Sequence, residues 1–193
     1  MLRLVPVVEP SLHGPPLDWA LPAAGESWIA LHGNVSDGDV ARVVATLANY
    51  NRIAHDGSAQ SAVKALERAP TLVAPGGLLI HVNGIDICPG CCCGLETWHE
   101  WRLVRPGGHS PWLGHDPSPS VECKEAHAVV WVDADAGDAS PSIPVEYAEI
   151  DQALAEASID ISQFARRLSE WLGFNAPESA GFRQKFDNAF AVA

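Results

Sequence analysis

The sequence predicts an α+β protein, with a mixed or antiparallel sheet, helices, and a C-terminal third that is mainly helical. Three observations support this fold class. Apolar runs of strand length are bounded by turn residues, apolar residues recur at helical spacing in other segments, and the two kinds of segment do not follow strict β-α-β alternation. A length of 193 residues suits one ordinary domain, so we expect a single domain over residues 1–193.

Strands and helices alternate irregularly in the first half of the chain. The expected elements are strands at residues 2–8, 27–32 and 78–82 and helices at residues 37–50 and 59–69. The first strand is expected at an edge of its sheet. Ser36 and Asp39 have the spacing of a capping box, which predicts the start of the first helix. Residues 75–77, Pro-Gly-Gly, predict a turn before the third strand.

Two loops occupy the centre of the sequence. Residues 83–94 form a cysteine-rich loop, and residues 105–120 form a long loop with four Pro and three Gly. Between them, residues 95–104 predict a short helix that carries Trp98 and Trp101. Because this helix also carries several charged residues, we do not expect it to bury both rings fully.

The remaining elements lie toward the C-terminus. Strands are expected at residues 126–133 and 143–147, and helices at residues 148–157, 161–172 and 178–190. Asp160 and Gln163 predict the cap of the second of these helices, and Gly173 predicts its end. The sequence therefore predicts three separate helices in the last third.

The charge balance excludes one class of partner. The chain has 12 basic and 24 acidic residues, a net charge of −12. Affinity for nucleic acid comes largely from Lys and Arg that neutralise phosphates, so a nucleic-acid partner is not expected. Basic proteins, small molecules and metal cations suit an acidic protein better.

Cysteine usage and hydropathy indicate the compartment. Four of the five cysteines fall within residues 88–93, which is unlike the even spread of a secreted disulfide scaffold. No apolar run has the length of a secretory or membrane-spanning segment. We therefore expect a cytoplasmic protein that has no membrane partner.

The cysteine-rich loop carries most of the chemical information in the sequence. Cys88-Pro-Gly-Cys91 is a C-x-x-C turn of the kind that presents two thiolates to one metal ion, and a tetrahedral zinc site needs two further ligands. Cys123 and His127 have a C-x3-H spacing that suits a second half-site. The candidate ligands of a Zn²⁺ ion are Cys88, Cys91, Cys92, Cys93, His99, His115, Cys123 and His127. His109 and His115 offer a further pair.

Two other interpretations of this loop stay open. Cysteine is often a buried, inert residue, so the thiols could serve only for packing. Alternatively, the loop is the centre of a metal- or thiol-dependent enzyme at Cys91–Cys93, with His99 or His115 as base and Asp116 as its orienting group. A thiol-rich protein for metal storage or delivery is a third class, and no enzyme motif is present to decide among them.

A long acidic stretch is the second distinctive feature. From Glu125 to Ala165 the chain has nine acidic residues and no Lys or Arg. Such a surface steers a basic partner electrostatically. The sequence therefore predicts a cytoplasmic accessory binding module, of immunity or inhibitor type, that docks a basic protein partner and whose Cys/His loop is fixed by zinc in a closed, four-coordinate site.

Overall fold

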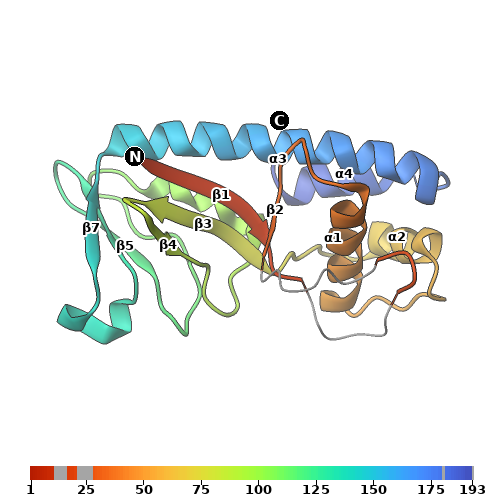
Figure 1. Ribbon diagram of the computed structural model, residues 1–193, viewed down its shortest axis with the longest axis horizontal. Helices are drawn as coiled ribbons and strands as arrows, with labels where there is room; N and C mark the ends of the chain where they lie inside the picture. Colours follow the sequence, from red (N-terminus) through yellow and green to blue (C-terminus); the bar gives the residue numbers. More distant parts are fainter. Residues whose placement is uncertain (11–16, 21–27, 180, 193) are drawn as a thin grey trace.

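The computed structural model describes residues 1–10, 17–20, 28–179 and 181–192, and Figure 1 shows how their elements are arranged. The strands are β1 (Leu2–Val8), β2 (Ile29–Ala30), β3 (Gly76–Val82), β4 (Ile85–Ile87), β5 (Ser120–Cys123), β6 (Ala128–Trp131) and β7 (Ser142–Val145). The helices are α1 (Asp37–Tyr50), α2 (Ala59–Arg68), α3 (Tyr147–Asn175) and α4 (Gly181–Ala189), with two short 3₁₀ helices, η1 (Leu95–Leu103) and η2 (Ala134–Ala139). Two antiparallel sheets with segregated helices confirm the predicted α+β class.

The larger sheet has the strand order β2-β1-β3-β4. The prediction of an edge position for β1 was wrong, because β1 pairs with β2 on one side and along its whole length with β3 on the other. Pro6 is compatible with this position. Its carbonyl accepts a hydrogen bond from Leu31 on the β2 side, so the N–H that proline lacks also falls on that side, where β2 is only two residues long. The strand predicted at residues 27–32 shortens to β2, and Ser27 lies outside the described residues.

A β-hairpin replaces two predicted irregular segments. Gly76 and Gly77, expected in a turn, begin β3, and a Cβ at Gly76 would lie 2.1 Å from the carbonyl oxygen of Val7. Beyond β3, Asn83 and Gly84 both have positive φ and make the two-residue turn to β4. The first part of the predicted loop at residues 83–94 is therefore a hairpin, and the cysteines follow β4.

The smaller sheet has the order β5-β6-β7 and lies at one end of the molecule (Figure 1). The strands predicted at residues 126–133 and 143–147 correspond to β6 and β7. The edge strand β5 was not predicted, because its four residues follow a Pro-rich segment and include Ser, Glu and Cys. Pairing with β6 holds these residues in an extended conformation that their own sequence does not predict, and Val121 lies opposite Val130.

A single long helix dominates the C-terminal third. The two helices predicted on either side of Ser158 and Ile159 are one helix, α3, which extends across the molecule above β1 (Figure 1). No Gly or Pro lies at the predicted break, and the buried face continues through Ala157, Ile161 and Phe164. Gly173 does not end the helix, which continues to Asn175. Within the described part of the chain, no helix has the combination of length and apolar content that crossing a membrane requires.

Buried aromatic side chains pack the C-terminal helices together. Phe186 of α4 lies 5.8 Å from Phe164 and 4.5 Å from Phe190, measured between ring centroids, and all three are buried. Trp98 and Trp101 of η1 are also buried, contrary to the expectation that this helix would not bury both rings fully. A 3₁₀ helix has three residues per turn, so two residues three apart share its inner face.

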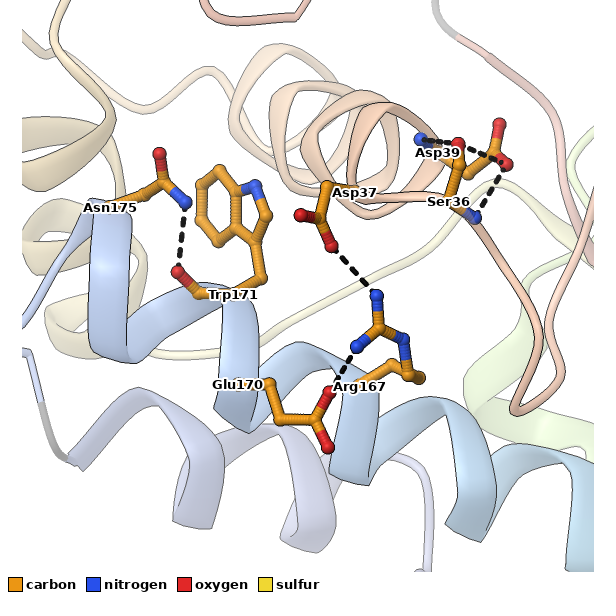
Figure 2. Close-up of polar contacts among 7 residues, drawn as sticks. All are labelled: Ser36, Asp37, Asp39, Arg167, Glu170, Trp171 and Asn175. Atoms are coloured by element: carbon orange, nitrogen blue, oxygen red, sulfur yellow. Dashed lines mark hydrogen bonds and ion pairs between the residues drawn. The ribbon is translucent and has the colours of Figure 1, made fainter.

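Polar contacts fix the beginning of α1 and its position on α3. Ser36 and Asp39 form the predicted capping box, which satisfies the first backbone N–H groups of the helix. Arg167 of α3 bridges Asp37 of α1, at 2.7 Å, and Glu170 of its own helix (Figure 2). These contacts stabilise the helical part of the molecule.

Candidate metal site

The cysteine loop and the long loop meet as two short antiparallel segments. The backbone N–H of Gly90 donates to the carbonyl of Leu113 at 2.8 Å. Cys91 and His115 exchange two backbone hydrogen bonds, at 2.6 and 3.1 Å. The sequence separation of these residues gives no hint of this pairing. It brings a thiol of one loop beside an imidazole of the other.

Two glycines allow the loops to approach this closely. A Cβ at Gly90 would lie 2.4 Å from the carbonyl oxygen of Pro117 and 2.6 Å from the backbone nitrogen of His115. Gly114 has φ of +91°, and a Cβ there would lie 2.4 Å from the carbonyl carbon of Gly90. Because all these neighbours are backbone atoms, a larger residue at either position would force the loops apart.

Three side chains converge at this meeting point. The ligand atoms of Cys91, Cys92 and His115 all lie within 4.8 Å of one another, and the two Sγ atoms are 3.5 Å apart. Both cysteines are exposed, and His115 is partly exposed. Cys92 has φ of +63°, and its carbonyl accepts a hydrogen bond from the indole Nε1 of Trp112 at 3.1 Å. The backbone and Trp112 thus hold Cys92 in place.

The other two cysteines of the loop have different surroundings. Cys93 is buried beneath the loop, and its thiol donates to the carbonyl of Trp112 at 3.6 Å. Cys88 is half-buried near Asp86 and Trp28. Neither belongs to the group of three. The C-x-x-C turn therefore contributes only Cys91 to the convergent set.

The more distant candidates are also outside the group. His99 is exposed on η1, Cys123 is half-buried at the end of β5, and His127 is in the turn between β5 and β6. In the part of the chain that the structure describes, Cys91, Cys92 and His115 form the one group of three His, Cys or carboxylate side chains close enough to share a metal ion.

Electrostatics distinguish the three thiols of the run. Burial raises the pKa of Cys93 to about 11, with further effects from Glu96 and Glu100, so this thiol stays protonated. Hydrogen bonds from Cys91 and then from His115 lower the pKa of Cys92, whereas the hydrogen bond with Cys92 raises the pKa of Cys91. Cys92 is accordingly the first thiol of this run to ionise.

His115 is oriented by the residue that follows it. Its Nδ1 lies 2.9 Å from Oδ2 of Asp116, a contact that, followed by the hydrogen bond with Cys92, raises the pKa of the imidazole. Because Nδ1 is engaged by the carboxylate, Nε2 is the nitrogen left to face the thiols. Carboxylate contacts of this kind orient metal-binding histidines.

The donor set has a recognisable chemistry. Two thiolates and an imidazole are ligands that zinc and other thiophilic ions prefer. Three protein ligands leave one tetrahedral position open, as in zinc sites that bind an exchangeable fourth ligand, whereas a structural zinc site has four protein ligands. The convergent set has three protein ligands, one fewer than the closed, four-coordinate site that the sequence predicts.

An open groove begins at His115. It has a volume of about 650 Å³, and its lining includes Glu100, His109, Trp112, His115 and Asp135. The Trp112 ring is half-exposed and lies 6.4 Å from the His115 ring, between centroids. The groove gives a second molecule access to the side of the convergent residues.

One neighbour of the site was missed from the sequence. Tyr50 ends α1, and its phenol is close enough to the loop that burial, then the charges of Cys92, Glu96 and Cys91, raise its pKa. No sequence signal connects Tyr50 with cysteines some forty residues away.

Comparisons with known protein families, curated proteins and solved structures find no match for this chain. The function is therefore inferred from the chemistry of the site.

Proposed function

We propose that this chain is an accessory protein that binds one thiophilic metal ion, Zn²⁺ in the first instance, at Cys91, Cys92 and His115. The observation that carries the proposal is the convergence of two thiols and an imidazole within 4.8 Å, from two loops, on an exposed corner. Gathering two thiolates in an acidic protein is electrostatically unfavourable unless a cation neutralises them. A divalent ion bound by two thiolates and a neutral imidazole gives a formally neutral site.

Reversible binding suits this site better than a structural role. Backbone hydrogen bonds and glycine contacts already hold the two loops together. The metal is therefore not needed to form the corner, and an open fourth position lets a competing ligand attack the ion. The proposal is a protein that takes up and releases metal.

The cytoplasm is the compartment that we propose. All five cysteines are free thiols, and two of them are adjacent and exposed. Such thiols persist only where the surroundings are reducing. We also propose a basic protein partner, which the exposed carboxylates Asp135 and Asp138 of η2 support.

A zinc titration tests the metal proposal. Protein purified without a chelator or histidine tag and kept reduced would be made metal-free, then titrated against a chromophoric zinc chelator. We expect one Zn²⁺ per chain, and affinity reduced by about tenfold or more in Cys91→Ser, Cys92→Ser and His115→Ala. Cys123→Ser is the matched control, because Cys123 is outside the group. Equal affinity in Cys92→Ser and Cys123→Ser would overturn the proposal.

Thiol catalysis is a second candidate, and one observation favours it. Cys92, His115 and Asp116 form a chain of contacts in which a thiol of lowered pKa is next to an imidazole that a carboxylate orients. This is the arrangement of an activated cysteine nucleophile. The groove beside His115 offers room for a substrate.

Alkylation kinetics distinguish the two candidates. Under either candidate, iodoacetamide should modify Cys92 faster than Cys91 in metal-free protein at neutral pH, because the pKa of Cys92 is lowered and that of Cys91 is raised. For a nucleophile, Cys92 should still react much faster once each rate is corrected for the thiolate fraction, and His115→Ala should abolish that excess. For a pure metal site, the corrected rates should be similar, and zinc should protect both thiols. Cys93 is the internal control, since its burial should prevent modification until the protein unfolds.

A further inference from the structure

Next to the metal site, two adjoining hollows form one acidic groove lined by two tryptophans, of which Trp112 is half-exposed and Trp131 is partly buried. The first is the groove of about 650 Å³ lined by Trp112, Glu100 and Asp135. The second, of about 440 Å³, is lined by Trp131, Glu122 and Asp138. The two hollows share the lining residues Ser110, Ser120 and Ala134, so they adjoin each other. We call this surface the tryptophan groove.

The two halves of the tryptophan groove share an aromatic and acidic character. Each half contains one indole ring and two carboxylates, and neither half is lined by Lys or Arg, while His109 and His115 line only the first. Among the residues that the structure describes, Glu100, Asp135 and Asp138 form no ion pair, whereas Glu122 is paired with Lys124. The groove therefore presents three carboxylates whose charge no cation of the described chain balances.

The Trp112 ring is held in a position to contact a ligand. Its Nε1 donates to the carbonyl of Cys92, and its backbone N–H lies 3.4 Å from a carboxylate oxygen of Glu100. The ring is nevertheless 54% exposed. A half-exposed indole anchored at its polar atom offers its face to a second molecule. Indole rings bind cations over their faces, and a guanidinium group does so most often.

We propose that the tryptophan groove binds an extended segment of a basic protein partner through two arginine side chains. One guanidinium stacks on Trp112 between Glu100 and Asp135, and the other lies beside Trp131 and Asp138. Arginine fits better than lysine because its planar group stacks on an aromatic ring and donates to a carboxylate at the same time. The volumes are in the range of binding sites for groups of this size.

This inference goes beyond the metal proposal and does not depend on it. A zinc ion bound by two thiolates and neutral His115 adds no net positive charge at the end of the groove, so it does not repel an arginine. A partner docked in the groove would lie against the metal site through His115, which lines the groove. Metal binding and partner docking would then occur at one corner.

The test measures binding of a fluorescein-labelled peptide that carries two arginines separated by glycine, by fluorescence anisotropy at low salt. The comparison peptide has citrulline at both positions, which preserves the shape and removes the charge. We expect the citrulline peptide to bind about tenfold more weakly or worse, and rising salt to weaken the arginine peptide. Failure of the arginine peptide to bind, or equal binding of both peptides, would overturn the proposal.

Matched variants locate the binding surface. Asp135→Asn with Asp138→Asn should weaken arginine-peptide binding by about tenfold, whereas Asp151→Asn with Glu156→Gln, the same charge change on α3, should have less than about a twofold effect. Equal weakening by both pairs would show general attraction to an acidic protein and would overturn the assigned site. Trp112→Phe should retain more binding than Trp112→Ala.

Two cross-measurements separate this proposal from the metal proposal. Asp135→Asn with Asp138→Asn should bind zinc as the unmodified protein does. Cys91→Ser with Cys92→Ser should bind the arginine peptide as the unmodified protein does. Loss of peptide binding in the cysteine variant would show that the peptide binds the cysteine corner, and would overturn the assignment to the tryptophan groove.

Discussion

The corner around Cys91, Cys92 and His115 is held by backbone hydrogen bonds and close glycine contacts, whereas α3 and α4 are held by buried aromatic side chains. The corner keeps its reactive groups exposed because few of its side chains are needed for packing. The helical part buries most of its large apolar side chains, with Phe174 and Ile159 as exceptions. Stability and reactivity are therefore located in different regions. Substitutions in the helical part should mainly lower the free energy of unfolding, and substitutions at the corner should mainly lower zinc affinity.

The largest effect is expected in the helical region. Phe186→Ala should lower the free energy of unfolding by about 3–5 kcal/mol, because the Phe186 ring is buried against Phe164 and Phe190 and its removal leaves a cavity. Urea denaturation measures the change. The control is Phe174→Ala, whose ring is 89% exposed and should change stability by less than about 0.5 kcal/mol.

Zinc binding by the folded Phe186→Ala protein should remain close to normal. Parallel losses of stability and of zinc affinity would show that the two regions are energetically coupled.

At the corner, a substitution should affect binding more than stability. Gly90→Ala places a Cβ against backbone atoms of His115 and Pro117, so the loops must separate. We expect zinc affinity to fall by about tenfold, equivalent to about 1.4 kcal/mol, with a smaller loss of stability than Phe186→Ala. Titration with a chelator and urea denaturation on the same sample measure both quantities.

Gly173→Ala is the matched control for Gly90→Ala. Nothing lies within 4 Å of a Cβ at Gly173, which is in the helical region of α3. The control should raise stability by about 0.5–1 kcal/mol and leave zinc affinity unchanged. Unaltered zinc affinity in Gly90→Ala would argue against the close approach of the loops as the basis of the site.

The helix cap should give a smaller effect. Ser36→Ala removes the side chain that accepts from the backbone N–H of Asp39, and should lower stability by about 1 kcal/mol. Although burial opposes it, the hydrogen bonds from Ser36 and the contact with Arg42 lower the pKa of Asp39. The stabilisation from ionised Asp39 is therefore present above its ordinary pKa and is lost as the pH falls through the lowered value.

Thermal unfolding at neutral and acidic pH measures the effect of Ser36→Ala. The difference between the variant and the unmodified protein should shrink in acid. A difference that is constant from neutral pH to about pH 3 would contradict the role assigned to the carboxylate of Asp39.

The smallest effect concerns the exposed imidazole. Contact with Asp116, and then with Cys92, raises the pKa of His115, so protons compete with the metal from a pH above the ordinary value for histidine. Zinc affinity should therefore fall as the pH drops through this raised pKa. The contact between protonated His115 and Asp116 also stabilises the folded metal-free protein in acid. This stabilisation is lost as the pH rises through the raised pKa of His115 in the folded state.

Asp116→Asn should lower the pKa of His115 by less than about one unit, as followed by NMR titration of the metal-free protein. Cys92→Ser should lower it less than Asp116→Asn does. An unchanged His115 pKa in Asp116→Asn would show that the carboxylate does not orient this imidazole.

Local sequence signals predicted much of the framework. The capping box at Ser36 and the apolar spacing of residues 37–50 predicted α1 because both are properties of one segment. Asn83-Gly84 is a strong hairpin signal that the interpretation of residues 83–94 as a loop passed over. The division of α3 near Asp160 failed because a capping residue inside a long apolar stripe does not end a helix.

The candidate site was predictable only as a set of residue types. Eight cysteines and histidines were plausible ligands, since each offers a suitable atom and sequence spacing does not order distant loops. The structure brings three of them together. The C-x-x-C spacing of Cys88 and Cys91 does not place both of these cysteines in the group. A residue's neighbours across a fold depend on how other elements pack.

Local periodicity and composition account for the α+β class, the first helix, the negative charge and the thiols gathered in one short segment. Long-range packing is responsible for the central position of β1, the continuity of α3, and the meeting of Cys91 and Cys92 with His115 beside an acidic groove. These arrangements depend on contacts between residues far apart in the chain, above all the approach of Gly90 to Gly114, which no local pattern specifies.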